Sequence, residues 1–161
     1  MKTKLTFLLS LTFLFLFSGS SFVFADDLQD GWDAYDRKDY KTAYKLWLPL
    51  AEQGNASAQV NLGAMYGKGL GVPQDYKEAV KWYRLSAEQG FADAQYNLGS
   101  MYGNGQGVLQ DYVSAHMWWN LSGSNGFKDA VTNRNIVEKK MSKQKIEEAQ
   151  RLARNWKPTS K

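Results

Sequence analysis

The apolar positions of the chain recur at helical spacing. Between residues 56 and 68 the apolar side chains are spaced as i, i+4, i+7 and i+8, at Ala58, Leu62, Met65 and Tyr66. This spacing puts them along one face of an α-helix. A second stripe of the same kind follows a glycine-rich segment, at Tyr76, Ala79, Trp82 and Ser86. The pattern predicts two amphipathic helices joined by a loop.

The residues beside the second stripe favour helix ends. Asp75 precedes the stripe, and we expect its carboxylate to accept an amide hydrogen bond from the first turn while Glu78 reaches back to the Asp75 amide. Glycine follows such stripes at three places, where a left-handed residue ends a helix: Gly54, Gly90 and Gly126. The sequence therefore predicts where the second helix of each pair begins and ends.

The helix pair is an internal repeat. Residues 51–86 and 87–122 align without a gap at a period of 36, and 23 of the 36 positions are identical. Such agreement indicates a duplication, and repeated helix pairs are typical of solenoids. The shared Gly63 and Gly99 lie inside the first helix of each pair, where glycine is unfavourable, so we expect them to let a neighbouring helix approach closely.

Partial repeats flank the two complete ones. We predict a degenerate N-terminal repeat at 26–50, repeat one at 51–86, repeat two at 87–122, a partial repeat at 123–141, and a C-terminal capping helix and tail at 142–161. In the partial repeat, Ile136, Val137 and Met141 are expected to continue a third first-type helix. Ser142 is expected to cap the final helix, Lys143 to Trp156, whose amphipathic face covers the solenoid end.

Residues 1–25 have the order of a secretory signal peptide. Lys2 and Lys4 precede the apolar run 5–17, and small residues lead to Ala25, after which we expect cleavage. An uncleaved membrane anchor is the alternative, since the uncharged run 5–25 is long enough to span a bilayer. We therefore expect a periplasmic or secreted domain, with no membrane insertion once the signal is cleaved.

Cleavage changes the interpretation of the charge. It removes two lysines and leaves 161 − 25 = 136 residues with a net charge of +2 instead of +4. A nearly neutral domain without a basic block does not suggest nucleic acid as a partner. The chain has no cysteine, so disulfides, thiol nucleophiles and zinc–thiolate sites are excluded.

Neither the glycines nor the histidine indicates catalysis or a cofactor. Gly67, Gly69 and Gly71 join two helices and recur one period later, so they predict a turn and not a phosphate-binding loop, which follows a strand. His116 is the single histidine and replaces the valine at position 80, so it is expected to be a partly exposed or packed imidazole. We expect no enzyme activity, no cofactor and no metal.

These repeats resemble those of the Sel1-like repeat (SLR) family, relatives of the tetratricopeptide repeats. The resemblance covers about residues 39–130 and falls on positions that recur after 36 residues: Ala56, Ala58, Gln59, Leu62, Gly63, Tyr66, Gly69, Gly71, Val72, Asp75, Ala79 and Trp82. It implies an all-α fold, a short right-handed α-solenoid of antiparallel helix pairs with a C-terminal capping helix. It also implies an adaptor that binds an unidentified protein or peptide, often in the bacterial envelope.

Two alternatives to an adaptor stay open. Some members of the family, rich in cysteine, have been linked to the binding or hydrolysis of β-lactams, and a small envelope hydrolase of this kind would have to use His116. This chain lacks the cysteines of those members. An oligomer, or a structural cap of a larger assembly, is the other alternative, since two complete repeats form only a short groove.

The positions that differ between the two copies suggest a binding face. On the first helices they are spaced by 3, 4 and 4 residues, which is one helical face. First helices line the concave side of tetratricopeptide-like solenoids, so we predict a protein-binding surface with Tyr96 as its anchor, formed by Ser57, Val60, Ala64, Lys68, Asp93, Tyr96, Ser100 and Asn104. Neutral drift of a solvated face is the alternative.

The second helices also differ along one face. Repeat one carries Lys77, Val80, Lys81 and Arg84, where repeat two carries Val113, His116, Met117 and Asn120. We expect these residues to lie on the outer surface of the solenoid. An exposed Val113 and Met117 would then form an apolar patch suited to a homo-oligomer contact.

Overall fold

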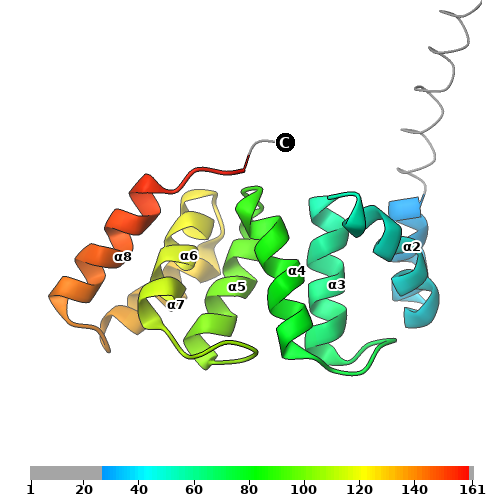
Figure 1. Cartoon of the computed structure of the whole chain (residues 1–161), viewed down its shortest axis with the longest axis horizontal. Coiled ribbons are helices and arrows are strands. Elements are labelled where there is room, and N and C mark those ends of the chain that lie inside the picture. Colours follow the sequence, from blue (N-terminus) through cyan, green and yellow to red (C-terminus); the bar gives the residue numbers. More distant parts are fainter. Residues whose placement is uncertain (1–26, 160–161) are drawn as a thin grey trace, which may run out of the picture.

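The computed structural model describes residues 27–159, and all regular secondary structure in this range is helical (Figure 1). The predicted signal peptide and its cleavage site lie outside the described residues. Residues 27–36 are helical and precede seven helices: α2 (Tyr40–Glu52), α3 (Ala56–Lys68), α4 (Tyr76–Glu88), α5 (Ala92–Asn104), α6 (Tyr112–Ser124), α7 (Lys128–Glu138) and α8 (Lys143–Asn155).

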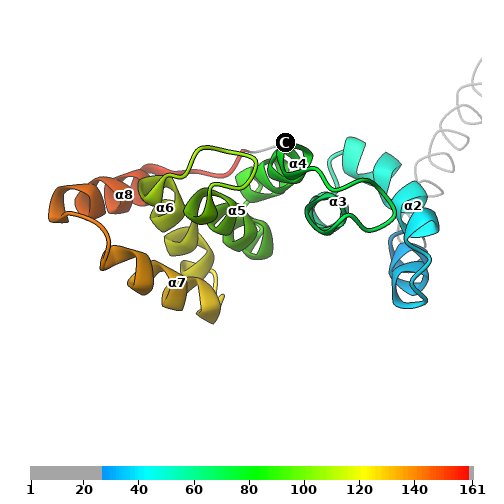
Figure 2. The ribbon, with the colours of Figure 1, turned by 90° about the horizontal axis from the view of Figure 1, so that it is seen from below.

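The helices form an antiparallel solenoid of two layers. Consecutive helices from α2 to α7 contact one another, and α8 packs on α6. In Figure 2, α4 and α8 lie along the upper edge of the solenoid, and α7 and the first helical segment project below it. We call α3, α5 and α7 the inner helices, and α4, α6 and α8 the outer helices. The first helical segment and α7 bend towards the same side, so this side of the solenoid is concave. This arrangement confirms the predicted all-α solenoid with a C-terminal capping helix.

Side-chain caps begin α4 and α8 as the sequence predicts, with one difference. The Asp75 carboxylate accepts from the amides of Lys77 and Glu78 at 2.8 and 3.2 Å. The predicted return contact from Glu78 is wrong, because the Glu78 carboxylate pairs with Lys81 at 3.2 Å and the Asp75 amide donates to the Tyr66 carbonyl. At the last helix, Ser142 accepts from the Lys145 amide at 3.4 Å, as expected of a cap.

Glycines inside the first helices make room for aromatic rings of the second helices. A Cβ at Gly63 would stand 2.7 Å from the Tyr83 ring, and a Cβ at Gly99 or Gly103 would stand 2.8 Å from Trp119. Real Cβ contacts are longer than this, so only glycine admits the rings at these distances. The expected close approach at Gly63 and Gly99 is therefore confirmed, and it is the aromatic side chains that approach.

The glycine loops also hold neighbouring repeats together. Gly71 and Gly107 have φ values of 73° and 72°, in the left-handed region. Each lies against the first residue of a second helix one repeat earlier, Gly71 against the backbone of Tyr40 and Gly107 against the backbone of Tyr76. The loops thus join consecutive repeats through their backbones.

α7 confirms the predicted third first-type helix at Ile136 and Val137, but two other expectations about the C-terminal third are wrong. α7 ends at Glu138, Met141 lies beyond it, and Ile136 is 52% exposed, although Val137 is buried. Val113 and Met117 are half-buried and not an exposed patch. Met117 packs in a cluster with Trp118 and Trp156, because α8 and the segment after it cover this side of α6.

Candidate functional site

A groove on the concave side contains five of the eight predicted binding residues. It has a volume of about 410 Å³ and lies between the first helical segment, α3 and the start of α5. The predicted residues that line it are Ser57, Val60, Ala64, Lys68 and Asp93. These five residues therefore line one hollow. We call it the concave groove.

The other three predicted residues lie elsewhere on the same side. Tyr96 stacks on Phe127, with ring centroids 4.8 Å apart, and is half-buried. Ser100 and Asn104 line a separate hollow between α5 and α7. The stacked pair shows that Tyr96 has an internal packing role, which the sequence pattern did not indicate.

Aromatic side chains form the walls of the concave groove. Trp32 and Phe91 line it and are 40% and 41% exposed, which is unusual for such large apolar groups. Trp32 is held edge-on against the buried Trp47 at 5.1 Å between centroids, so its position is fixed from behind. Tyr35 packs at 5.9 Å from Trp32. Rigid exposed aromatic rings of this kind are typical anchors of protein interfaces.

One hydrogen-bond donor of the groove has no partner. Asn61 lines the groove and is only 7% exposed, and its Nδ2 is buried without a hydrogen-bond partner among the described residues. A buried donor in this state destabilises the folded chain by about 1–3 kcal/mol. An acceptor oxygen brought by a bound molecule would remove that cost.

Asparagine recurs at this position in successive repeats, and in the last repeat its amide has a hydrogen-bond acceptor. Asn97 lines the same groove one period later, and Asn133 of α7 follows after another period. The Asn133 Nδ2 donates to the Tyr96 hydroxyl at 3.4 Å. Val60 stands one period before Tyr96, so no hydroxyl is present at the equivalent place for Asn97. At Asn97 the groove therefore lacks the acceptor that α5 supplies to α7.

Charged side chains of opposite sign flank the groove. Lys68 ends α3 and Asp93 lies in the first turn of α5, and both are exposed. The site thus combines aromatic walls, amide donors and one charge of each sign. This mixture suits a polypeptide segment, because a peptide supplies carbonyl acceptors and apolar side chains together.

A family model establishes the relationship of the chain to known proteins. The model of the Sel1 repeat matches residues 28–55, 56–91 and 92–127. The chain belongs to the Sel1 repeat family. The second and third matches begin at the first residues of α3 and α5, so each Sel1 repeat consists of an inner helix followed by an outer one. Sel1 repeats generally form non-catalytic scaffolds that bind proteins.

Two solved structures with Sel1-type repeats are similar to this chain. A protective antigen from uropathogenic Escherichia coli strains, with an SLR fold, is 32% identical, with a TM-score of 0.79 over 83% of this chain and 29% of that one. A Sel1 repeat protein from Oxalobacter formigenes is also 32% identical, with a TM-score of 0.66 over 81% of this chain and 56% of that one. The chain thus spans less than two-thirds of either protein.

No curated protein sequence matches the chain. Within residues 27–159, no group of three or more potential metal ligands is present. In that same range, no helix is long and apolar enough to cross a membrane.

Several groove residues were missed by the sequence pattern. Asn61 and Asn97 are identical in the two copies, so they are not among the differing positions. Trp32 lies in the degenerate repeat, and Phe91, although it differs from Asn55, precedes the first helix of its repeat. The recurrence of asparagine on the inner face was the available signal. A buried amide without a partner among the described residues, such as that of Asn61, has no architectural reason to be polar.

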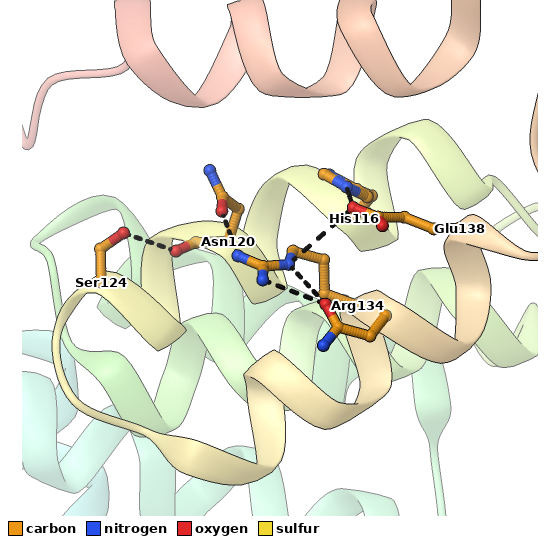
Figure 3. Close-up of polar contacts among 6 residues, drawn as sticks. His116, Asn120, Ser124, Arg134 and Glu138 are labelled. Atoms are coloured by element: carbon orange, nitrogen blue, oxygen red, sulfur yellow. Dashed lines mark hydrogen bonds and ion pairs between the residues drawn. The ribbon is translucent and has the colours of Figure 1, made fainter. Parts of the chain in front are cut away.

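His116 belongs to a polar network between α6 and α7 and does not line the groove. Its side chain is 0% exposed, and Nε2 lies 2.7 Å from the Glu138 carboxylate (Figure 3). Arg134 lies 4.0 Å from the same carboxylate and donates to Asn120 at 2.8 Å. The expected packed imidazole is confirmed. An imidazole without access to solvent has no route to a substrate in this conformation.

Proposed function

We propose that this protein is an exported, non-enzymatic adaptor that binds an extended segment of another protein in its concave groove. The observation that carries the proposal is the buried Nδ2 of Asn61, which has no partner among the described residues. A main-chain carbonyl of the bound segment accepts from this group. Sel1 repeats generally mediate protein–protein interaction, which supports the assignment of the segment to a protein.

The aromatic walls define the rest of the bound segment. An apolar side chain of the partner packs against Trp32 and Phe91, which line the groove and are 40% and 41% exposed. Removal of such rings from water supplies most of the affinity of a short segment. Lys68 and Asp93 then favour a partner with an acidic side chain near the first and a basic one near the second.

A site-specific crosslinking experiment tests the groove. A photoreactive phenylalanine at Lys68 is expected to form an adduct with the partner in intact cells, because Lys68 lines the rim of the groove. The same residue at Leu109, which is 91% exposed on a loop, is the matched control and should give no adduct with that partner. Mass spectrometry of the adduct identifies the partner.

A second substitution connects the adduct with Asn61. Asn61→Leu is similar in size and removes the donor, so the yield of the Lys68 adduct should fall at least about tenfold, the equivalent of 1.4 kcal/mol. Equal yields from Lys68 and Leu109, or an adduct unaffected by Asn61→Leu, would contradict the proposal.

Export is proposed from the N-terminal sequence alone. The order of charged, apolar and small residues in 1–25 is that of a cleavable signal. N-terminal sequencing of the protein from a periplasmic or culture-medium fraction should begin at Asp26. Recovery of the intact chain from membranes would favour the uncleaved anchor, and recovery from the cytoplasm would contradict export.

A further inference from the structure

The outer side of the solenoid carries a second groove, over Trp82. It has a volume of about 450 Å³ and lies between the end of α2 and the C-terminal half of α4, where Gly54, Leu85 and Glu52 line it, and Thr159 of the C-terminal segment borders it. Leu85 is 41% exposed, whereas Trp82 is 6% exposed and its Nε1 is buried without a hydrogen-bond partner in the described range. We call this hollow the outer groove.

The equivalent hollow one repeat later is filled by the chain itself. Trp156, the residue after α8, packs edge-on against Trp118 with ring centroids 6.2 Å apart. A Cβ at Gly90 would stand 3.9 Å from both Trp156 and Pro158. The amide and hydroxyl of Thr159 donate to the Glu88 carbonyl at 2.8 and 3.1 Å. Figure 1 shows this segment, in red, running along one edge of the solenoid towards α4.

The two hollows share most of their floor, although Lys81, whose ammonium lies 5.3 Å from the centroid of the Trp82 ring, replaces Met117 in the outer groove. The residues that hold the C-terminal segment, including Leu121 of the same apolar cluster, each have a counterpart 36 residues earlier in the outer groove. Gly90, Glu88, Trp118 and Leu121 correspond to Gly54, Glu52, Trp82 and Leu85. Leu121 is half-buried in the filled hollow, while Leu85 is exposed in the open one. The duplication has therefore produced two similar hollows, and the C-terminal segment of the chain fills the one over Trp118.

We propose that the outer groove binds an extended segment of another protein that carries a tryptophan followed two residues later by a proline. The filled hollow shows this chemistry: Trp156 covers Trp118, Pro158 lies beside Gly90, and the backbone after Pro158 donates to a carbonyl at the end of the outer helix. In the outer groove the corresponding acceptor is the carbonyl of Glu52. This surface is separate from the concave groove, and the two bind independently.

A foreign segment fits the outer groove better than the tail of a second copy. The tail of each copy is already engaged, by the Trp118 contact and by two hydrogen bonds from Thr159. A second copy would have to lose these contacts before its tail could enter the outer groove, so the exchange would gain nothing in contact energy. A segment from another protein has no such contacts to lose.

The proposal is tested by a peptide taken from the chain. The probe is the acetylated peptide RNWKPT, the sequence of residues 154–159, added to the ¹⁵N-labelled domain at up to about 1 mM, a concentration suited to weak binding. The indole N–H signal of Trp82 should shift and saturate, while that of Trp118 should not move, because its hollow is filled. The same peptide with alanine at its tryptophan should produce no shift.

A pair of matched variants locates the binding. Leu85→Lys places a charge on the floor of the outer groove, and because Leu85 is 41% exposed the fold should survive. The shift of the Trp82 indole should be lost. Leu109→Lys adds the same charge on an exposed loop and should bind the peptide normally. Asn61→Leu, in the concave groove, should also bind it normally, so failure of the concave-groove proposal is distinguishable from failure of this one.

A further variant is a positive control for the probe. Trp156→Ala empties the hollow over Trp118, so the peptide should now shift the indole signals of both Trp82 and Trp118. A shift at Trp118 alone would overturn the proposal, since it would show that the outer groove rejects the segment. So would a dimer in sedimentation experiments that Leu85→Lys dissociates, because the occupant would then be a second copy.

Discussion

Tyr83 and Trp119 occupy equivalent positions in the two complete repeats but have different surroundings. Tyr83 packs against Gly63, and the nearest atom to a Cβ at Gly67 would be the Ala79 methyl, at 3.8 Å. Trp119 is larger and packs against both Gly99 and Gly103. These glycines are identical in both copies, yet no aromatic ring packs against Gly67. Identity between copies therefore does not by itself show that a residue is needed.

On the outer helices, by contrast, residues that differ between the two copies make contacts that hold the fold together. Val80 and Arg84 face the next repeat, where Val80 is buried and Arg84 donates to the Tyr102 hydroxyl at 2.7 Å. Their counterparts His116 and Asn120 contact Glu138 and Arg134 of α7 instead. Lys81 is exposed, whereas its counterpart Met117 is half-buried and packs against the same apolar cluster as Trp156. The differences between copies reflect what covers each copy.

The largest expected effect on stability concerns the left-handed loop glycine that both repeats share. Gly71→Ala and Gly107→Ala each force a side chain into the left-handed region and against the backbone of the preceding repeat. Each should lower the free energy of unfolding by about 2–5 kcal/mol, measured by urea denaturation. A marked difference between the two variants would show that the loops are not equivalent.

The next prediction separates two glycines that the sequence cannot distinguish. Gly103→Ala should destabilise the domain by about 1–3 kcal/mol, because the new Cβ would meet the Trp119 ring at 2.8 Å. Gly67→Ala should stabilise it by up to about 1 kcal/mol, since space is available and alanine favours helix. The melting temperatures of the two variants should move in opposite directions. A change of both melting temperatures in the same direction would contradict this prediction.

Substitution of the inner-face asparagines should change the free energy of unfolding by a smaller amount. Asn61→Leu removes a buried donor without a partner, so it should raise the free energy of unfolding by about 1–2 kcal/mol. Asn133→Leu removes a donor that is bonded to the Tyr96 hydroxyl and should not stabilise the domain. A loss of stability in Asn61→Leu would show that Asn61 has a scaffold role.

The smallest effect concerns alkaline pH and two tyrosines of repeat one. Burial raises the pKa of Tyr83, and the Tyr44 hydroxyl, at 2.9 Å, raises the pKa of Tyr66 to about 12. Above pH of about 10, the ordinary tyrosine value, the unfolded chain loses these protons first, so the free energy of unfolding falls. Tyr83→Phe should reduce this fall. Trp119, the counterpart of Tyr83, cannot ionise.

Denaturation curves between pH 9 and pH 12 measure this dependence. Tyr83→Phe keeps the ring against Gly63, so its stability near neutral pH should stay close to that of the unmodified domain. An unchanged slope above pH of about 10 in this variant would exclude Tyr83 as a source of the alkaline sensitivity.

Much of the fold could be predicted because its determinants are local. Helical spacing, the Asp75 cap and the left-handed glycines act within one or two turns, and each appears in the structure where the sequence places it. The end of α7 could not be placed, because Ile136 continues the apolar pattern and yet is 52% exposed. The apolar spacing alone does not show how far neighbouring helices cover α7, so it does not mark the residue at which the helix ends.

The candidate site could be predicted only in part. The spacing of the differing residues placed Ser57, Val60, Ala64 and Lys68 on one face, and they share one groove. The same spacing did not show that Tyr96 is held by Phe127, or that Trp32 reaches the groove from the first helical segment. Contacts of this kind join residues about 30 positions apart, which no local pattern records.

The sequence by itself determined the helix pairs, their period of 36 and the all-α solenoid, because the information for each helix lies in its own turns. Only the tertiary structure decided which residues are covered. It left Asn61 without a partner in one groove, and it filled one of two equivalent outer hollows with Trp156 while the other stays open. The reason is that the burial of a side chain depends on neighbours brought from distant parts of the chain.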